Sequence, residues 1–182
     1  MSNLLSDKEQ KLLLEIARES ITGFITDGQT PTHEVATKKL LTPQGCFVTI
    51  RNNGELRGCI GIFVAERPLF QMIQEMAVSA ATRDPRFYPM KKVDLDSFKV
   101  EISVLSPLKK IERAEEIKVG VHGLYLEKRA MRGVLLPQVA VENRWDRETF
   151  LSQTCLKAGL RHDEWQEGAN IYTFKAQVFG EA

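Results

Sequence analysis

This chain of 182 residues has little cysteine and little histidine. Its three cysteines, Cys46, Cys59 and Cys155, are odd in number and far apart, which is typical of free thiols in a reducing compartment and excludes a disulfide scaffold. Neither a Cys-x-x-Cys motif nor a Cys/His cluster has the spacing of a zinc site. We therefore expect no metal site, and no cofactor motif is evident.

Long apolar runs and an excess of one charge are also missing. No apolar run approaches the roughly 20 residues of a membrane span, and the N-terminus lacks the charged-then-apolar layout of a signal peptide. The formal net charge of +1 gives no global attraction to nucleic acid or anionic membrane, although it does not exclude a local basic patch. We expect a cytoplasmic protein that does not associate with membranes.

The apolar pattern predicts helices and strands that do not alternate regularly. Ser6 and Glu9 form a capping box before a run of apolar residues at helical spacing, and Asp146 is placed to cap a later helix. We expect helices at 7–26, 68–84 and 147–158, short helical turns at 114–117 and 163–166, hairpins at 45–61 and 122–136, and strands at 98–105 and 171–179. This order predicts an α+β fold with a mainly antiparallel sheet and flanking helices.

The first hairpin contains the most informative segment, Leu56-Arg57-Gly58-Cys59-Ile60-Gly61. Two glycines around one cysteine weaken a strand and suggest that something approaches the backbone closely. A three-residue loop at 52–54 would pair Thr49 with Arg57 and Phe47 with Cys59. That register places Leu56 on the core face and predicts that Arg57 and Cys59 share the less apolar face.

Six further runs carry a resemblance to a known family. They are Gly45–Thr49, Ala77–Ala81, Asp84–Phe87, Val100–Ser106, Arg132–Ala140 with Trp145-Asp146, and Lys157–Leu160. With the hexapeptide they follow, in order, the pattern of the AMMECR-one family, also called AmmeMemoRadiSam system protein A. Cys46 departs from it, because the family more often has an aliphatic residue there, and we interpret Cys46 as a packing position.

The resemblance implies one domain over residues 1–182 with two unequal lobes and a cleft between them, the larger lobe formed by both chain ends. It also implies a Memo-like protein and a radical-SAM protein as partners, with modification of a nucleic acid or other biomolecule as a proposed joint role. The family lends no settled activity, so whether this chain is an enzyme stays open.

The residues themselves suggest several site candidates, each with a structural alternative. Arg57 and Arg86, with Arg51 as a further candidate, could form an anion site, or Asp84 or Glu101 could neutralise them in structural ion pairs. The amide of Gln138 could read a base edge or a peptide group, or cap local backbone. Glu101 could instead pair with Arg57 across the sheet.

Cys59 is the candidate nucleophile, with His122 as its candidate base and Gly58 and Gly61 leaving room for a substrate. The alternative is a small buried residue in a tight strand.

Two functional hypotheses follow. The first is a binding or accessory component that holds an anionic, nucleotide-like or nucleic-acid-like ligand in a cleft at Leu56–Gly61. The second is a cysteine-dependent enzyme with Cys59 as nucleophile and Arg57 as the stabiliser of developing negative charge.

Overall fold

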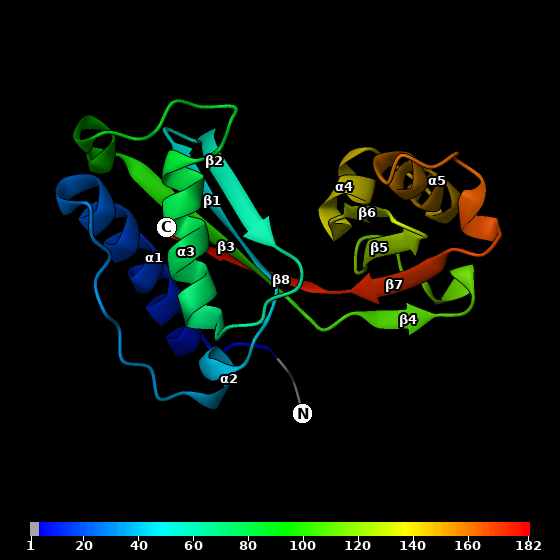
Figure 1. Cartoon of the computed structure of the whole chain (residues 1–182), viewed down its shortest axis with the longest axis horizontal. Helices are drawn as coiled ribbons and strands as arrows, with labels where there is room; N and C mark the ends of the chain where they lie inside the picture. The colour runs from blue at the N-terminus through cyan, green and yellow to red at the C-terminus, as the bar shows by residue number, and fades with distance from the viewer. Residues whose placement is uncertain (1–3) are drawn as a thin grey trace. The chain divides into compact units, whose positions relative to one another are not determined.

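The computed structural model describes residues 4–182, which divide into two compact units (Figure 1). The first unit combines the chain up to Leu105 with Gln177–Ala182, and the second is Ser106–Ala176. Helices accompany an antiparallel sheet in each unit, which confirms the predicted α+β class. The second unit is thus inserted into the sequence of the first.

The first unit is a four-stranded sheet with two long helices packed on one face (Figure 1). The sheet order is β2-β1-β3-β8. Its strands are β1 (Cys46–Asn52), β2 (Glu55–Ile62), β3 (Phe98–Leu105) and β8 (Ala176–Gly180). Its helices are α1 (Asp7–Asp27), α2 (Lys38–Leu41), α3 (Leu69–Thr82) and the 3₁₀-helix η1 (Lys92–Asp96). Apolar side chains of α1 and α3 form one buried core with the facing strand residues.

Local signals set the limits of the two long helices. The capping box predicted at Ser6 and Glu9 is confirmed, with the Ser6 N–H donating to Glu9 Oε2 at 2.7 Å. Gly28 ends α1 in the left-handed conformation, with φ of 73°. Pro68 stands at the N-cap of α3, and the helix ends at Thr82, shortly before Pro85.

The second unit is a smaller sheet, of order β4-β7-β5-β6, with helices on one side. Its strands are β4 (Lys109–Ile111), β5 (Gly123–Lys128), β6 (Met131–Leu135) and β7 (Asn170–Phe174). Its helices are α4 (Pro137–Glu142), α5 (Arg147–Lys157) and the 3₁₀-helices η2 (Ala114–Glu116) and η3 (Glu164–Gln166). Phe150 and Leu151 of α5 pack against Leu124 and Leu126 of β5, and Asp146 caps α5 as predicted by accepting from the Thr149 N–H at 2.8 Å.

The single strand predicted at 171–179 is wrong, because the chain there forms two strands in two different sheets. β7 pairs with β4 and β5 in the second unit, and β8 lies beside β3 in the first. The change falls at Lys175, whose N–H donates to Ser106 Oγ at 2.8 Å. Both sheets accept residues that favour strands, so the composition of this segment does not reveal the change.

None of the helices within residues 4–182 combines the length and the apolar character that crossing a membrane requires.

Candidate functional site

The first hairpin differs from its predicted register. Asn52 pairs with Glu55, so the loop is the two-residue turn Asn53-Gly54, whose φ angles of 52° and 83° are those of a type I′ turn. The two-residue turn alone would pair Cys59 with Val48, and a one-residue bulge between the turn and Gly58 then places Cys59 opposite Thr49, not Phe47. The sequence Asn-Asn-Gly is compatible with both loop lengths, and the two-residue turn matches the twist of the paired strands.

A β-bulge at Arg57 shifts the pairing of the hairpin by one residue. From Gly58 onward, side chains of β2 again alternate between the core face and the outer face of the sheet. Leu56 pairs with Arg51 and Gly58 pairs with Ile50, so Arg57 is the extra residue between them. The prediction that Leu56 lies on the core face is wrong, because it is 36% exposed. The alternation that would place Arg57 and Cys59 on one face is broken at the same point. A bulge re-aims the side chain that it carries, which separates Arg57 from the strand pattern around it.

Cys59 lies in a row across the sheet face opposite to the helices. Its partner Thr49 in β1 pairs in turn with Glu101 in β3, so Glu101 is two strands, or about 9–10 Å, from Cys59. Thr49 Oγ1 donates to Cys59 Sγ at 3.2 Å, and the thiol-bearing residue is partly exposed. Glu101 itself lines a hollow of about 390 Å³ together with Arg51 and Lys99.

The two glycines of the hexapeptide are closely packed by the protein itself. A Cβ on Gly58 would lie 2.1 Å from the carbonyl oxygen of Ala80 in α3, and a Cβ on Gly61 would lie 2.3 Å from the ring of Phe47. Helix–sheet packing therefore requires glycine at 58, and the Phe47 ring fills the space beside Gly61. Packing alone accounts for both residues.

Asp84 joins β2 to the segment after α3. It is buried, and its Oδ2 accepts from the Cys59 N–H at 2.8 Å. It also accepts three bonds from Arg86, through the backbone N–H, Nε and Nη2. Hydrogen bonding to the Arg86 side chain is the main reason why the pKa of Asp84 lies far below its ordinary value. Arg86 thus forms the structural ion pair that the sequence offered as its alternative role.

Arg57 has a different and incomplete set of partners. Its Nη2 is 3.7 Å from Asp94 Oδ2, and its guanidinium carbon is 6.0 Å from the centre of the Phe87 ring. Its Nη1 is buried and has no hydrogen-bond partner among the described residues. Glu101 is not the acid that approaches it. The guanidinium carbon of Arg86 is 5.5 Å from the same ring centre, so two guanidinium groups contact one ring.

The other predicted site residues, His122 and Gln138, lie in the second unit. His122 Nδ1 accepts from the Lys118 N–H at 3.1 Å, and burial lowers the pKa of this histidine, with nearby lysines acting in the same direction. Gln138 is exposed in the first turn of α4, a helix that the sequence analysis did not predict. Among residues 4–182, no group of three or more His, Cys, Asp or Glu side chains is arranged to hold a metal ion.

Sequence reasoning missed two residues of this site, Phe87 as a ring shared by two arginines and Asp94 as the acid near Arg57. Asp94 lies 37 positions after Arg57 in a short 3₁₀-helix, and nothing in its spacing indicates the contact. Phe87 carried a usable signal, because Arg86 and Phe87 are adjacent in a segment constrained by Pro85.

Comparisons with known proteins place the whole chain in one family. The family model AMMECR1 matches residues 14–179. Protein MK0488 of Methanopyrus kandleri is 41% identical over 100% of this chain and 92% of its own length, and Protein MJ0810 of Methanocaldococcus jannaschii is 42% identical over 98% and 92%.

A solved structure agrees with these matches. The crystal structure of the uncharacterized protein PH0010 from Pyrococcus horikoshii has a TM-score of 0.87 and 38% identity, covering 97% of this chain and 93% of that one. The family that the hexapeptide and the later runs resemble is therefore confirmed, and this protein belongs to the AMMECR1 family.

Proposed function

We propose that this protein is a binding component that holds an anionic ligand, such as a nucleotide or nucleic-acid phosphate, at Arg57. The observation that carries the proposal is the buried Arg57 Nη1, which lacks a hydrogen-bond partner among the described residues. A buried donor without a partner costs free energy, and in a native protein it calls for an explanation such as a bound ion. Phosphate and carboxylate oxygens match the planar fork of arginine.

The hydrogen-bond donors of Arg57, which its acidic neighbour leaves unused, support an anion-binding site. Asp94 Oδ2 stands 3.7 Å from Arg57 Nη2, beyond the usual hydrogen-bond distance, so it neutralises the guanidinium without satisfying its donors. Arg86, which contacts the same Phe87 ring, adds a second positive charge, and its side chain is 55% exposed. Because Asp84 already holds Arg86, Arg57 is the arginine with bonding capacity to spare.

Binding can be measured by titration calorimetry with inorganic phosphate, ATP and a single-stranded oligonucleotide. We expect Arg57→Ala to weaken binding about tenfold or more, since a charge-assisted hydrogen bond is lost. Asp94→Asn should tighten it, because the competing carboxylate is gone. Arg161→Ala is the matched control, since that side chain is 76% exposed in the second unit. Equal affinities for Arg57→Ala and the unaltered protein would refute the proposal.

The cysteine-dependent enzyme stays as the alternative, supported by one contact. The Thr49 hydroxyl donates to Cys59 Sγ at 3.2 Å, which holds the sulfur of a partly exposed cysteine in one direction. This alternative predicts that Cys59→Ser abolishes catalytic turnover of a substrate by this protein, while Arg57→Ala leaves the binding of ligand and partner proteins intact. The Memo-like and radical-SAM proteins implied by the resemblance are the first partners to test in that assay.

A further inference from the structure

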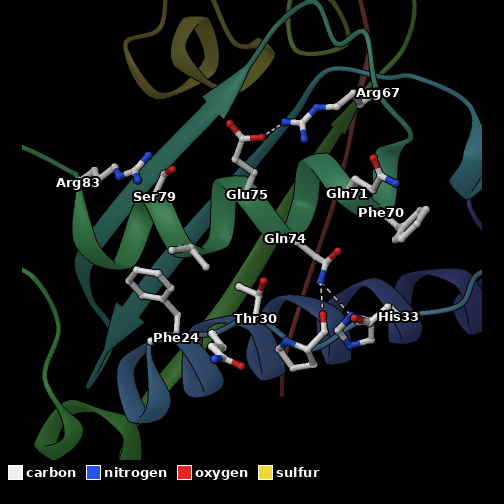
Figure 2. A pocket seen from close by; sticks show the side chains of 15 residues that line it. Phe24, Thr30, His33, Arg67, Phe70, Gln71, Gln74, Glu75, Ser79 and Arg83 are labelled. Atoms are coloured by element: carbon white, nitrogen blue, oxygen red, sulfur yellow. Dashed lines mark hydrogen bonds and ion pairs between the residues drawn. The ribbon is translucent and has the colours of Figure 1, made fainter.

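A second site is indicated on the outer surface of the helices of the first unit, away from Arg57. A hollow of about 760 Å³ lies between α3, the end of α1 and the loop 28–33 (Figure 2). This volume lies in the usual range of small-molecule sites. Every residue that lines it belongs to the first unit.

The wall formed by the loop is held in place. The Gln74 side chain reaches from α3 to the loop, where its Nε2 donates to the Pro31 carbonyl at 2.9 Å and lies 3.0 Å from His33 Nδ1 (Figure 2). His33 Nε2 in turn lies 2.8 Å from Glu19 of α1. A Cβ on Gly23 would be 2.8 Å from the Gln29 carbonyl, so the loop lies directly against α1. A hollow with such a fixed wall is largely preformed, which lowers the cost of binding.

The two ends of the hollow differ in charge. Arg67, at one end, is bound by Glu75 (Figure 2). Arg83 lies at the other end, beside Ser79, and within residues 4–182 its side chain takes part in no ion pair or hydrogen bond. The hollow therefore offers a guanidinium that the protein does not neutralise.

Ser79 adds a hydroxyl that is not used by its own helix. Two fully buried hydroxyls elsewhere in the helices donate to the carbonyl four residues earlier: Ser20 to Ile16 and Thr154 to Phe150, each at 2.7 Å. No such bond is found for Ser79 among the described residues, although it is only 8% exposed and lines the hollow. The Ser79 hydroxyl is not one of the fully enclosed polar atoms, so it is open to water or to a ligand in the hollow.

The floor beside these polar groups is apolar. Phe24 reaches from α1 toward α3 (Figure 2), and Val78 of α3 also lines the hollow. An aromatic ring with a hydroxyl and a guanidinium at one side matches a ligand with a flat apolar body and one anionic group. We infer that this hollow binds an aromatic carboxylate or aromatic phosphate, with the anionic group at Arg83 and Ser79 and the flat body against Phe24.

The two halves of such a ligand can be tested separately by titration calorimetry. The probes are 2-naphthoate and AMP as complete ligands, acetate and inorganic phosphate as anions alone, and naphthalenemethanol and adenosine as bodies alone. We expect at least one complete ligand to bind about tenfold or more tightly than either of its halves. If 2-naphthoate binds and AMP does not, the ligand is an aromatic carboxylate. If AMP binds and 2-naphthoate does not, the ligand is an aromatic phosphate. If neither complete ligand binds more tightly than its halves, the inference is wrong.

Variants locate the bound ligand. Arg83→Ala should weaken binding about tenfold and Arg83→Lys less, while Ser79→Ala should cost a smaller factor. Arg161→Ala is the matched control, because that side chain is 76% exposed and lies in the second unit, and thermal unfolding checks that each variant is folded. Arg57→Ala should leave this affinity unchanged, which separates the result from that of the proposed function. An Arg83→Ala protein that is folded and binds like the unaltered one would overturn the assignment.

Discussion

At the scale of single residues, Gly58 shows how tightly the candidate site is tied to the core. Its missing side chain allows β2 to touch the Ala80 carbonyl of α3. We expect Gly58→Ala to lower the free energy of unfolding by about 1–3 kcal/mol, because a backbone atom stands where the methyl group would go. Gly180→Ala is the control, since its nearest neighbours are 3.4 Å or more away. Urea unfolding followed by circular dichroism makes the comparison, and equal losses would contradict it.

The three cysteines should differ in their rate of alkylation. Cys46 and Cys155 are fully buried, and burial raises the pKa of Cys46 to about 12 and also raises the pKa of Cys155. Cys59 is partly exposed. Iodoacetamide at pH 8 should therefore modify Cys59 well before the other two, as read by mass spectrometry of the peptides. All three should react in urea. Modification of Cys46 in the folded protein as early as that of Cys59 would contradict this prediction.

At the scale of elements, Asp84 links the end of α3 to the edge strand β2 and should give stability a pH dependence. Its pKa in the folded protein is far below the ordinary 3.8, chiefly through the Arg86 side chain. A lowered carboxyl pKa contributes stability that is complete above the ordinary value and fades as pH falls below it toward the folded value. We expect Asp84→Asn to lower the unfolding free energy at pH 7 by about 1–3 kcal/mol.

The pH profile separates this effect from a general loss of packing. Between pH 5 and pH 2 the unaltered protein should lose more stability than Asp84→Asn does, measured by urea unfolding at each pH. Glu142→Gln is a control, because that carboxyl is exposed and lies in the second unit. Parallel pH profiles for Asp84→Asn and the unaltered protein would show that Asp84 is not the responsible carboxyl.

The sequence predicts the elements more fully than the site, for a physical reason. Capping at Ser6 and Asp146 and the apolar pattern of the strand Phe98–Leu105 are local signals, and both caps and the strand are confirmed. The hairpin register depends on a bulge at Arg57 that no local pattern requires, and one inserted residue changes which side chains share a face. The contact of Arg57 with Asp94 depends on tertiary packing and is not encoded in spacing.

At the scale of the molecule, the two units can be followed separately because both tryptophans, Trp145 and Trp165, lie in the second. Phe150→Ala in the core of that unit should cost about 3–5 kcal/mol, and Ile73→Ala in the first about 2–5 kcal/mol. We expect Phe150→Ala to shift the fluorescence transition in urea, and Ile73→Ala to shift mainly the circular dichroism signal. If each variant shifts both transitions equally, the two units unfold as one.

The insertion of the second unit also sets an order of events during synthesis. β8 follows the whole second unit in the chain, so a ribosome completes Ser106–Ala176 before it supplies the strand that lies beside β3. Until then β3 is an open sheet edge, and Arg18 lacks Glu181, which it binds at 2.5 Å through Nε. Until β8 is made, the nascent first unit therefore has one open strand edge, which is a surface that a chaperone or a second nascent chain can bind.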